Sequence, residues 1–254
     1  MTALASQPNE AYPWNTIDAL RDLSVRKAGV MKKEISPNTK DLFGESGDMD
    51  WNKELEPLFR KYEGRKHPLE YETLYQLLVM VVLSARDSDR NINSLAPALF
   101  EKFPSIKDLA KASPEDLYPF ISKVSNFGSK AKWLTKTAKE IGDDGNIPLT
   151  QEGLTQHPGI GRKSANVIMS QMNAPAEGVI VDLHTLRVAP RLGIAQGTNP
   201  EKIEKQLMAK IPQKNWHILG MSLTYLGREI CRPTDPKCPE CVMNRVCAFY
   251  NSQK

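Results

Sequence analysis

Four cysteines lie within seventeen residues near the C-terminus, and the chain has no others: Cys231, Cys238, Cys241 and Cys247. A disulfide framework would spread its cysteines so that they join distant segments. Cysteines crowded in this way indicate a metal centre, because thiolates are soft ligands that suit zinc or an iron–sulfur cluster. Zinc modules usually pair two short Cys–Cys elements, whereas this segment has one short pair flanked by gaps of six and five residues. The spacing therefore favours one compact cluster, with zinc as the alternative.

Helical spacing of apolar residues recurs along the chain, and few segments alternate apolar and polar residues, so we predict an all-α fold. The most apolar stretch, Leu74–Leu83, is too short to cross a bilayer and predicts a buried helix. Ser113 and Asn199 each precede a proline and an acidic residue, which is typical of a helix start. Trp216–Ile230 predicts one long helix that leads into the first cysteine. Because the first residues lack a basic start followed by an apolar run, we expect no secretory signal and a cytoplasmic protein without a membrane partner.

The first fifty residues differ in charge and pattern from the rest of the chain. They hold six Lys and Arg against eight Asp and Glu, which leaves 28 basic against 22 acidic residues in the remainder, a net charge of +6. A basic body suits a polyanionic partner, although many proteins without one have a similar charge. Thr16–Lys33 predicts one amphipathic helix, and the polar stretch Ser36–Asp50 predicts a linker. We therefore expect residues 1–49 to form an N-terminal extension or arm.

The heptapeptide His-Pro-Gly-Ile-Gly-Arg-Lys at residues 157–163 joins two predicted helices. Pro158 and Gly159 stop the first helix, and Gly161 allows a tight turn and a close approach to a ligand. The helix that follows exposes unpaired N–H groups at its start, and such groups can hold a phosphate regardless of base sequence. The alternative is an ordinary helix–helix connection that uses glycine for its geometry.

Lys163 is expected in the first turn of that second helix, where the positive end of the helix dipole disfavours a cation. A partly desolvated lysine in such a place loses its proton more easily, because burial favours the neutral form. A neutral amine is a nucleophile and can form a Schiff base. The alternative is a lysine that only contacts phosphate.

Asp182 directly follows the apolar run Gly178–Val181, so its carboxylate is expected to lie beside a buried apolar surface. A carboxylate there could stabilise a positive charge that develops on a sugar, or shuttle protons. It could equally be the N-cap of the following helix, and the two roles are compatible. His184, two residues further on, is more often a packing or capping residue than a catalyst.

Three segments resemble the endonuclease III family of DNA glycosylases, and they occur in the order that the family has. Residues 157–167, His-Pro-Gly-Ile-Gly-Arg-Lys-Ser-Ala-Asn-Val, resemble the helix-hairpin-helix of the family. Val181 and Asp182, followed by His184 and Arg187, resemble its Gly/Pro-rich loop and aspartate. The cysteine segment resembles its 4Fe–4S loop. The resemblance covers about residues 52–249, and three motifs in order are far more specific than any one of them.

The resemblance implies a protein of two helical lobes. Residues 65–177 would form a six-helix barrel that carries the helix-hairpin-helix motif. The helix at residues 50–64 would join residues 178–254 in a lobe that holds a 4Fe–4S cluster on the four cysteines. Double-stranded DNA would lie across the cleft between the lobes. The cluster would be structural and is not expected to take part in bond breaking.

The same resemblance implies that Lys163 is the Schiff-base lysine and Asp182 the catalytic aspartate. The expected DNA contacts are Pro158, Gly159, Gly161, Arg162, Arg86, Asn126, Phe127, Lys130, His184 and Arg187. Arg86 stands where family members commonly have glutamine, which helps to fill the gap left by the flipped base. Asn126 and Phe127 replace the usual aliphatic–aromatic pair of a loop that wedges the duplex, and Phe127 is the expected wedge. These departures bear on recognition of the opposite base.

The implied activity is that of a bifunctional DNA glycosylase and AP lyase in base excision repair. Its partner would be duplex DNA with damaged or abasic sites, and oxidised pyrimidines are the substrate class that the resemblance suggests. We expect a monomer that works, in a bacterium, at the nucleoid. One alternative is a monofunctional glycosylase for alkylated or mismatched bases. Another is a non-catalytic helix-hairpin-helix protein, which would need no lysine–aspartate pair.

Overall fold

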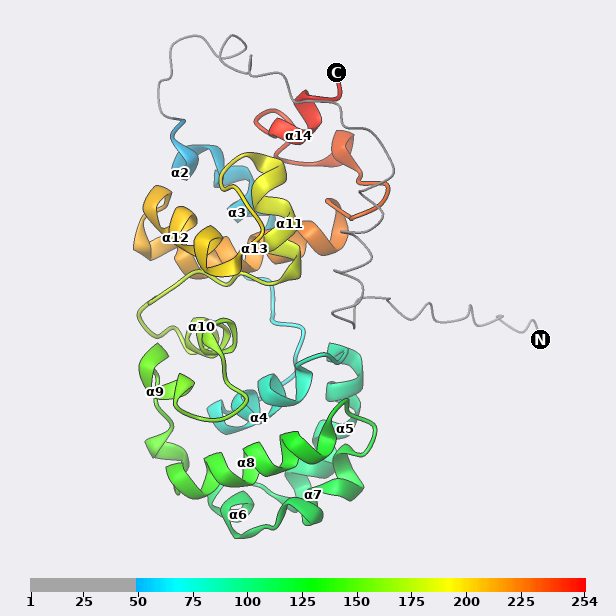
Figure 1. Ribbon diagram of the computed structural model, residues 1–254, viewed down its shortest axis with the longest axis vertical. Coiled ribbons are helices and arrows are strands. Elements are labelled where there is room, and N and C mark those ends of the chain that lie inside the picture. The colour runs from blue at the N-terminus through cyan, green and yellow to red at the C-terminus, as the bar shows by residue number, and fades with distance from the viewer. Residues whose placement is uncertain (1–48) are drawn as a thin grey trace, which may run out of the picture. The chain divides into compact units, whose positions relative to one another are not determined.

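The structure is a computed structural model and describes residues 49–254 (Figure 1). The helix expected over Thr16–Lys33 and most of the expected linker lie outside the described residues. All regular structure in the described part of the chain is helical, which confirms the predicted all-α class. These residues belong to one compact unit that begins at Asp48.

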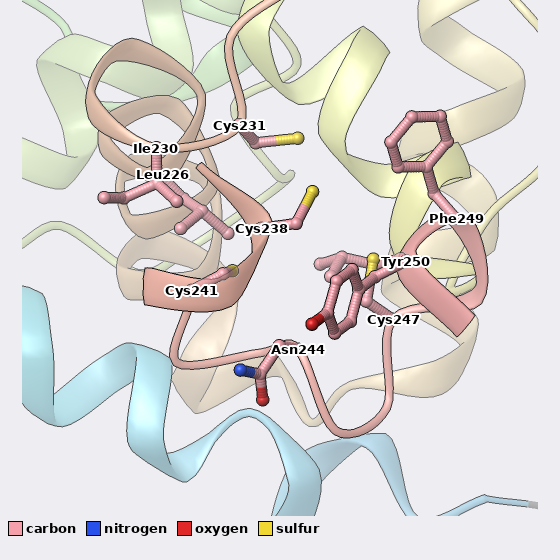
Figure 2. A pocket seen from close by; sticks show the side chains of 10 residues that line it. Leu226, Ile230, Cys231, Cys238, Cys241, Asn244, Cys247, Phe249 and Tyr250 are labelled. Atoms are coloured by element: carbon pink, nitrogen blue, oxygen red, sulfur yellow. The ribbon is translucent and has the colours of Figure 1, made fainter. Parts of the chain in front are cut away.

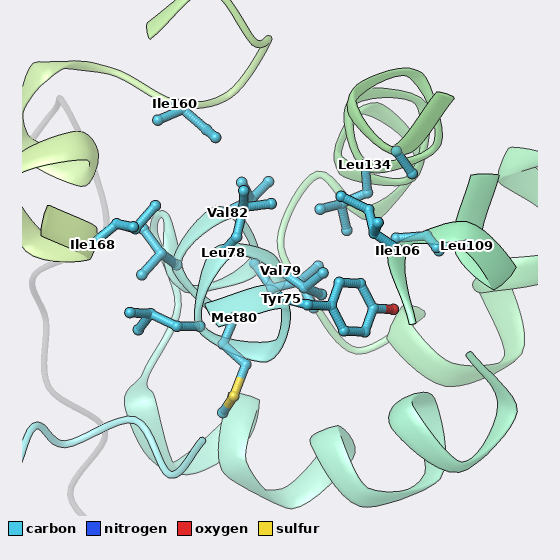
Figure 3. Close-up of a cluster of buried hydrophobic side chains, with 14 of the residues drawn as sticks. Tyr75, Leu78, Val79, Met80, Val82, Ile106, Leu109, Leu134, Ile160 and Ile168 are labelled. Atoms are coloured by element: carbon cyan, nitrogen blue, oxygen red, sulfur yellow. The ribbon is translucent and has the colours of Figure 1, made fainter. Parts of the chain in front are cut away.

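One hydrophobic core lies around α4, whose side chains are buried on nearly all sides (Figure 3). Thr73 starts this helix, because its side chain accepts a hydrogen bond from the N–H of Gln76. A helix that is apolar all round must be enclosed by other elements. The helices of this core are α4 (Leu74–Ser84), α5 (Asp89–Lys102), α6 (Ile106–Lys111), α7 (Pro114–Ile121), α8 (Phe127–Ile141), α9 (Gln151–Thr155) and α10 (Arg162–Gln171).

A second core combines the start of the described chain with its C-terminal part (Figure 1). Buried side chains from residues 51–62 pack with others from residues 179–247. The long helix α13 lies in its centre and packs against both α11 and α3. The elements of this core are α2 (Trp51–Glu54), α3 (Glu56–Tyr62), α11 (Leu183–Leu192), α12 (Pro200–Lys210), η2 (Gln213–Asn215), α13 (Trp216–Glu229), η3 (Cys238–Glu240) and α14 (Ala248–Asn251).

The helix starts and the long helix that the sequence predicts are present. Ser113 caps α7 in a capping box with Asp116. Asn199 caps α12 by accepting a hydrogen bond from the N–H of Lys202 at 2.9 Å. The helix expected from Trp216 is α13, which ends one residue earlier than predicted, at Glu229.

Candidate active site and metal centre

The hairpin between α9 and α10 turns at Gly159. This residue has a φ of +84°, a conformation that side chains disfavour. A Cβ atom added to Gly159 would lie 2.7 Å from Cε3 of Trp133, on α8. Gly161 instead has an extended φ of −91°, and a Cβ atom added to it would meet no other atom within 4 Å. The expectation that Gly161 makes the tight turn is therefore wrong, while the open space beside it leaves the main chain accessible.

The first turn of α10 offers main-chain donors to a ligand. Gly161 is the N-cap residue and supplies no side chain to cap the helix. The N–H groups of the first turn have no acceptor within the helix, and the helix dipole is positive at this end. Lys163 lies in this turn, and its side chain is exposed. This arrangement is one that binds a phosphate group.

Substituting the two hairpin glycines separately is expected to distinguish folding from DNA contact. Gly159→Ala should destabilise the protein by about 1–2 kcal/mol from the left-handed backbone alone, and more because Trp133 has to move. Gly161→Ala should leave the free energy of unfolding nearly unchanged, since its Cβ meets nothing. It should nevertheless weaken DNA binding, because the methyl group would stand between the main chain and a phosphate. Denaturant unfolding and titration with duplex DNA measure the two effects, and unchanged DNA affinity in Gly161→Ala would contradict a close main-chain approach.

One cavity brings Lys163 and Asp182 together. Its apolar lining includes Val81 and Val167 from helices of the first core and Met221 from α13. The other polar side chains that line it are His67, Ser84, Asp89, Thr224 and Arg228. The two residues singled out as catalytic candidates from separate motifs thus share one partly apolar site.

Asp182 is the N-cap residue of α11, as one of the two sequence interpretations predicts. Its Oδ1 accepts hydrogen bonds from the N–H groups of His184 at 2.9 Å and Thr185 at 2.8 Å. The buried residues Val179 to Val181 precede it and fix where the chain enters the helix. Its Oδ2 has no hydrogen bond within the described residues. One oxygen therefore fixes the carboxylate, and the other remains available to a ligand in the cavity.

His67 and an ion pair complete the polar lining, and sequence reasoning missed them. The Nδ1 of His67 accepts a hydrogen bond from the N–H of Leu69 at 3.2 Å. Burial, together with the positive charges of Lys163 and Arg228, lowers the pKa of His67 to about 4, although Asp89 acts in the opposite direction. The imidazole is therefore neutral near pH 7. Arg228 pairs with Asp89 at 2.9 Å between Nη1 and Oδ2.

Two loops are clamped together beside this cavity by the carboxylate of Asp87. Its Oδ2 accepts a hydrogen bond from the N–H of Ser125 at 2.7 Å, and its Oδ1 accepts one from Nδ2 of Asn91, also at 2.7 Å. The tips of the two loops are Arg86 and Asn126, which are both exposed and both left-handed, with φ of 62° and 56°. The Arg86 loop runs between Ser84 and Asp89, which line the cavity. The loop of Asn126 therefore lies against the loop of Arg86, where the Oγ of Ser125 also donates to the carbonyl oxygen of Arg86 at 3.1 Å.

The four cysteines line a second cavity at the C-terminal end of α13 (Figure 2). Burial raises the pKa of the Cys241 thiol to about 11, and it also raises the pKa of the Cys238 and Cys247 thiols. Arg191 donates a hydrogen bond from Nη1 to Sγ of Cys231 at 3.5 Å. Among the described residues, no three potential ligands lie close enough to hold one metal ion. The four thiols thus line one space.

A search for known relatives assigns the chain to a family. Residues 79–213 match the model of the HhH-GPD superfamily base excision DNA repair proteins. The chain is 35% identical to endonuclease III of Synechocystis over 192 residues, which are 75% of this chain and 88% of that protein. It is 33% identical to endonuclease III of Thermotoga maritima over 69% of this chain and 83% of that protein. The chain belongs to the endonuclease III family.

Solved structures agree with this assignment, which confirms the resemblance seen in the sequence. A non-covalent endonuclease III–DNA complex matches with a TM-score of 0.70 and 30% identity over 78% of this chain and 94% of that chain. A thermostable thymine-DNA glycosylase matches with a TM-score of 0.69 at 19% identity, over 79% of this chain and 98% of that one, and shows the fold alone. As a member of the family, the protein is a DNA N-glycosylase with AP lyase activity in base excision repair. No helix in residues 49–254 is long and apolar enough to span a membrane.

Two of the cations expected to contact DNA make hydrogen bonds within the protein. Lys130 is only 2% exposed, and its Nζ donates hydrogen bonds to the carbonyl oxygens of Leu83 at 2.7 Å and Ala85 at 2.6 Å. It therefore caps the C-terminal end of α4, where a cation is favoured. Arg187 donates to the carbonyl oxygens of Cys231 at 3.0 Å and Gly227 at 2.9 Å, and so ties α11 to the cysteine segment. Both cations thus have partners inside the protein, and the expected DNA contacts of Lys130 and Arg187 stay predictions.

Three other residues that we expect to contact DNA differ in their surroundings: Phe127, His184 and Arg162. Phe127, the expected wedge, packs edge-on against Tyr118 with ring centroids 5.1 Å apart, so the neighbouring Asn126 is the more exposed side chain. His184 is half-buried and lies 3.2 Å from Nη2 of Arg187 through its Nδ1, which agrees with a packing role. Arg162 pairs with Glu204 at 2.5 Å between Nε and Oε2, although its side chain is 46% exposed.

Proposed function

We propose that this protein removes damaged bases from duplex DNA and then nicks the strand through a Schiff base on Lys163. The observation that carries the proposal is that Lys163 and Asp182 line one cavity at the N-terminal end of α10. The two cores correspond to two lobes with this cavity between them. Oxidised pyrimidines are the proposed substrate class, and the polar lining offers the flipped base both donors and acceptors.

The reaction begins when the damaged nucleotide rotates out of the stack, which costs a few kcal/mol and less when damage has weakened pairing. The main-chain N–H groups at the start of α10 hold a flanking phosphate. Arg86 and Asn126 occupy the space that the nucleotide leaves in the duplex. Their clamped, left-handed loops hold both side chains outward before DNA arrives.

Lys163 then acts as a nucleophile in its neutral form. Its Nζ bonds to C1′ of the sugar while the bond from C1′ to the base breaks, and the base leaves with that electron pair and takes up a proton. Ring opening gives an iminium between Lys163 and C1′. Loss of a proton from C2′ then expels the 3′ phosphate by β-elimination, and water hydrolyses the iminium to free the lysine.

Asp182 stabilises the positive charge that develops on the sugar and assists proton transfer. Its bonds to His184 and Thr185 hold the carboxylate in place before the substrate binds. A charge that is already oriented costs no reorganisation at the moment of reaction. The neutral His67 adds no competing positive charge to the cavity.

Cys231, Cys238, Cys241 and Cys247 would hold a 4Fe–4S cluster. The four cysteines line one cavity, and thiolates are the ligands that such a cluster uses. In a cluster each thiolate binds a different iron, so ligands spread around one cavity fit it. The cluster would organise the C-terminal segment, which Arg187 and Arg191 tie to α11.

Loss of one cysteine is expected to remove the cluster and loosen the second core. Purified protein should contain about four irons per chain and absorb near about 400 nm. Cys241→Ser should lose most of both signals and unfold at a lower temperature, because the segment from Cys231 onward loses its cross-link. The exposed neighbour Val242, changed to threonine, is the matched control. A colourless wild-type protein with one zinc per chain would contradict the cluster.

The experiment that tests the proposed function scores base release and strand cleavage separately on a panel of lesions. Borohydride should trap the wild-type protein on abasic and oxidised-pyrimidine duplexes. Base release without strand cleavage or trapping would identify a monofunctional glycosylase for alkylated or mismatched bases. Binding of duplex DNA without either reaction would leave a non-catalytic DNA-binding protein.

The proposed partner is duplex DNA with damaged or abasic sites, which the protein binds as a monomer. Endonuclease III appears in complex with DNA among the similar structures. The related proteins come from bacteria. We therefore place its action in the cytoplasm, at the nucleoid, if its source is a bacterium.

A further inference from the structure

Glu204 is a buried carboxylate outside the cavity that the reaction does not use directly. It lies on α12 in the second core and is 5% exposed. A buried carboxylate is costly unless charged or polar partners surround it. The partners of Glu204 therefore show what it holds in place.

Its two oxygens bind three donors from two separate segments. Oε2 accepts from Nε of Arg162 at 2.5 Å. Oε1 accepts from Nδ2 of Asn166 and from the main-chain N–H of Val179, both at 3.1 Å. Arg162 and Asn166 lie on α10, one turn apart, while Val179 lies in the segment that leads into α11. One carboxylate thus joins the hairpin helix to the chain before Asp182.

The main chain passes very close to the carboxylate of Glu204 at Gly178. A Cβ atom added to Gly178 would lie 2.1 Å from Oε1 of Glu204 and 2.7 Å from Nδ2 of Asn166. Only a glycine lets the main chain pass this close to the carboxylate. Gln151 continues the network, because its Nε2 donates to Oδ1 of Asn166 at 2.8 Å and its Oε1 accepts from Nη1 of Arg162.

The two segments that Glu204 joins carry the two groups of the proposed reaction. Arg162 directly precedes Lys163, and Val179 stands three residues before Asp182. We propose that Glu204 is a positioning residue that fixes the start of α10 relative to the start of α11, and thereby Lys163 relative to Asp182. This inference rests on the proposed function of those two residues.

The expected consequence is a loss of rate rather than of DNA affinity. A misplacement of about 1 Å between reacting groups can cost about a hundredfold in rate. Glu204→Gln keeps the size of the side chain but removes its charge. Its amide also presents N–H to a site where three donors already point. The hairpin conformation that is expected to bind phosphate depends on Gly159 and α10, so the affinity for DNA should change little.

The test compares the single-turnover rate of borohydride-trapped adduct formation at saturating enzyme with the affinity for an uncleavable abasic-site duplex. Glu204→Gln should lower the rate about ten- to a hundredfold while the dissociation constant changes less than about threefold. Circular dichroism at the assay temperature gives the folded fraction. Asp144→Asn is the matched control, because the Oδ1 of Asp144 accepts from the N–H of Ile106 at 2.8 Å far along the chain from either segment. The control should keep the wild-type rate.

A second variant keeps the test valid if Glu204→Gln does not fold. Arg162→Gln changes a side chain that is nearly half exposed, breaks the ion pair with Glu204, and should lower the saturated rate in the same direction. A rate within about twofold of wild type in folded Glu204→Gln, or in Arg162→Gln where the first variant is unfolded, would overturn the positioning role alone. Absence of any adduct with the wild-type protein would instead overturn the proposed function and this inference with it.

Discussion

Lys163→Ala is expected to abolish covalent trapping on abasic and damaged duplexes, together with strand cleavage. The amine is the only group at this position that can bond to C1′, so no iminium forms without it. Because the side chain is exposed in the first turn of α10, its loss should leave the fold intact. Removing a cation from the positive end of the helix dipole should even stabilise the helix slightly, by about 0.3–1 kcal/mol.

Gel analysis after borohydride reduction measures the adduct, and denaturing electrophoresis without reduction measures the nick. Lys205→Ala, an exposed lysine on α12, is the matched control and should trap as well as the wild type. Undiminished trapping in Lys163→Ala would assign the Schiff base to another amine. The N-terminal amine and every other lysine would then need to be tested.

Asp182→Asn is expected to lower the rate about a hundred- to ten-thousandfold, the usual range for the loss of a group that transfers protons. Asparagine caps helices as well as aspartate does, so the bonds to His184 and Thr185 should persist. The free energy of unfolding should then change by no more than a few tenths of a kcal/mol.

Asp182→Ala separates the two roles, because alanine provides neither the cap nor the carboxylate. It should lose the same rate and, in addition, about 1 kcal/mol of stability. Stopped reactions under single-turnover conditions and denaturant unfolding give the two quantities. A wild-type rate in Asp182→Asn would show that the aspartate serves only as a helix cap.

Features that depend on neighbouring residues in the chain could be predicted from the sequence. These features include the spacing of the cysteines, the cap residues Ser113 and Asn199, and the apolar run that ends in Asp182. Each depends only on residues a few positions away in the sequence. Local propensity and hydrogen bonding decide such features. For the same reason, the all-α class could be predicted with no knowledge of the tertiary contacts.

Features set by tertiary contacts could not be predicted in this way. Asp89 and Arg228 pair across 139 positions of sequence, and nothing near either of them indicates the partner. Lys130 looks like any other surface lysine of an amphipathic helix, but the end of α4 lies against it and accepts its hydrogen bonds. Whether a cation faces a partner or an internal carbonyl depends on packing between helices, which the sequence does not show directly.

The division of the chain between the two cores sets the order in which the cores can fold during translation. Trp51, Leu55 and Leu58 leave the ribosome early, yet the residues they pack against begin only at Val179 and extend to Cys247. The buried residues of the first core end at Ile180, before most of the second core has been synthesised. During translation, the apolar sides of α2 and α3 therefore stay uncovered while the first core folds. A ribosome that stalls soon after Ile180 therefore leaves a complete first core, with the apolar sides of α2 and α3 not yet covered.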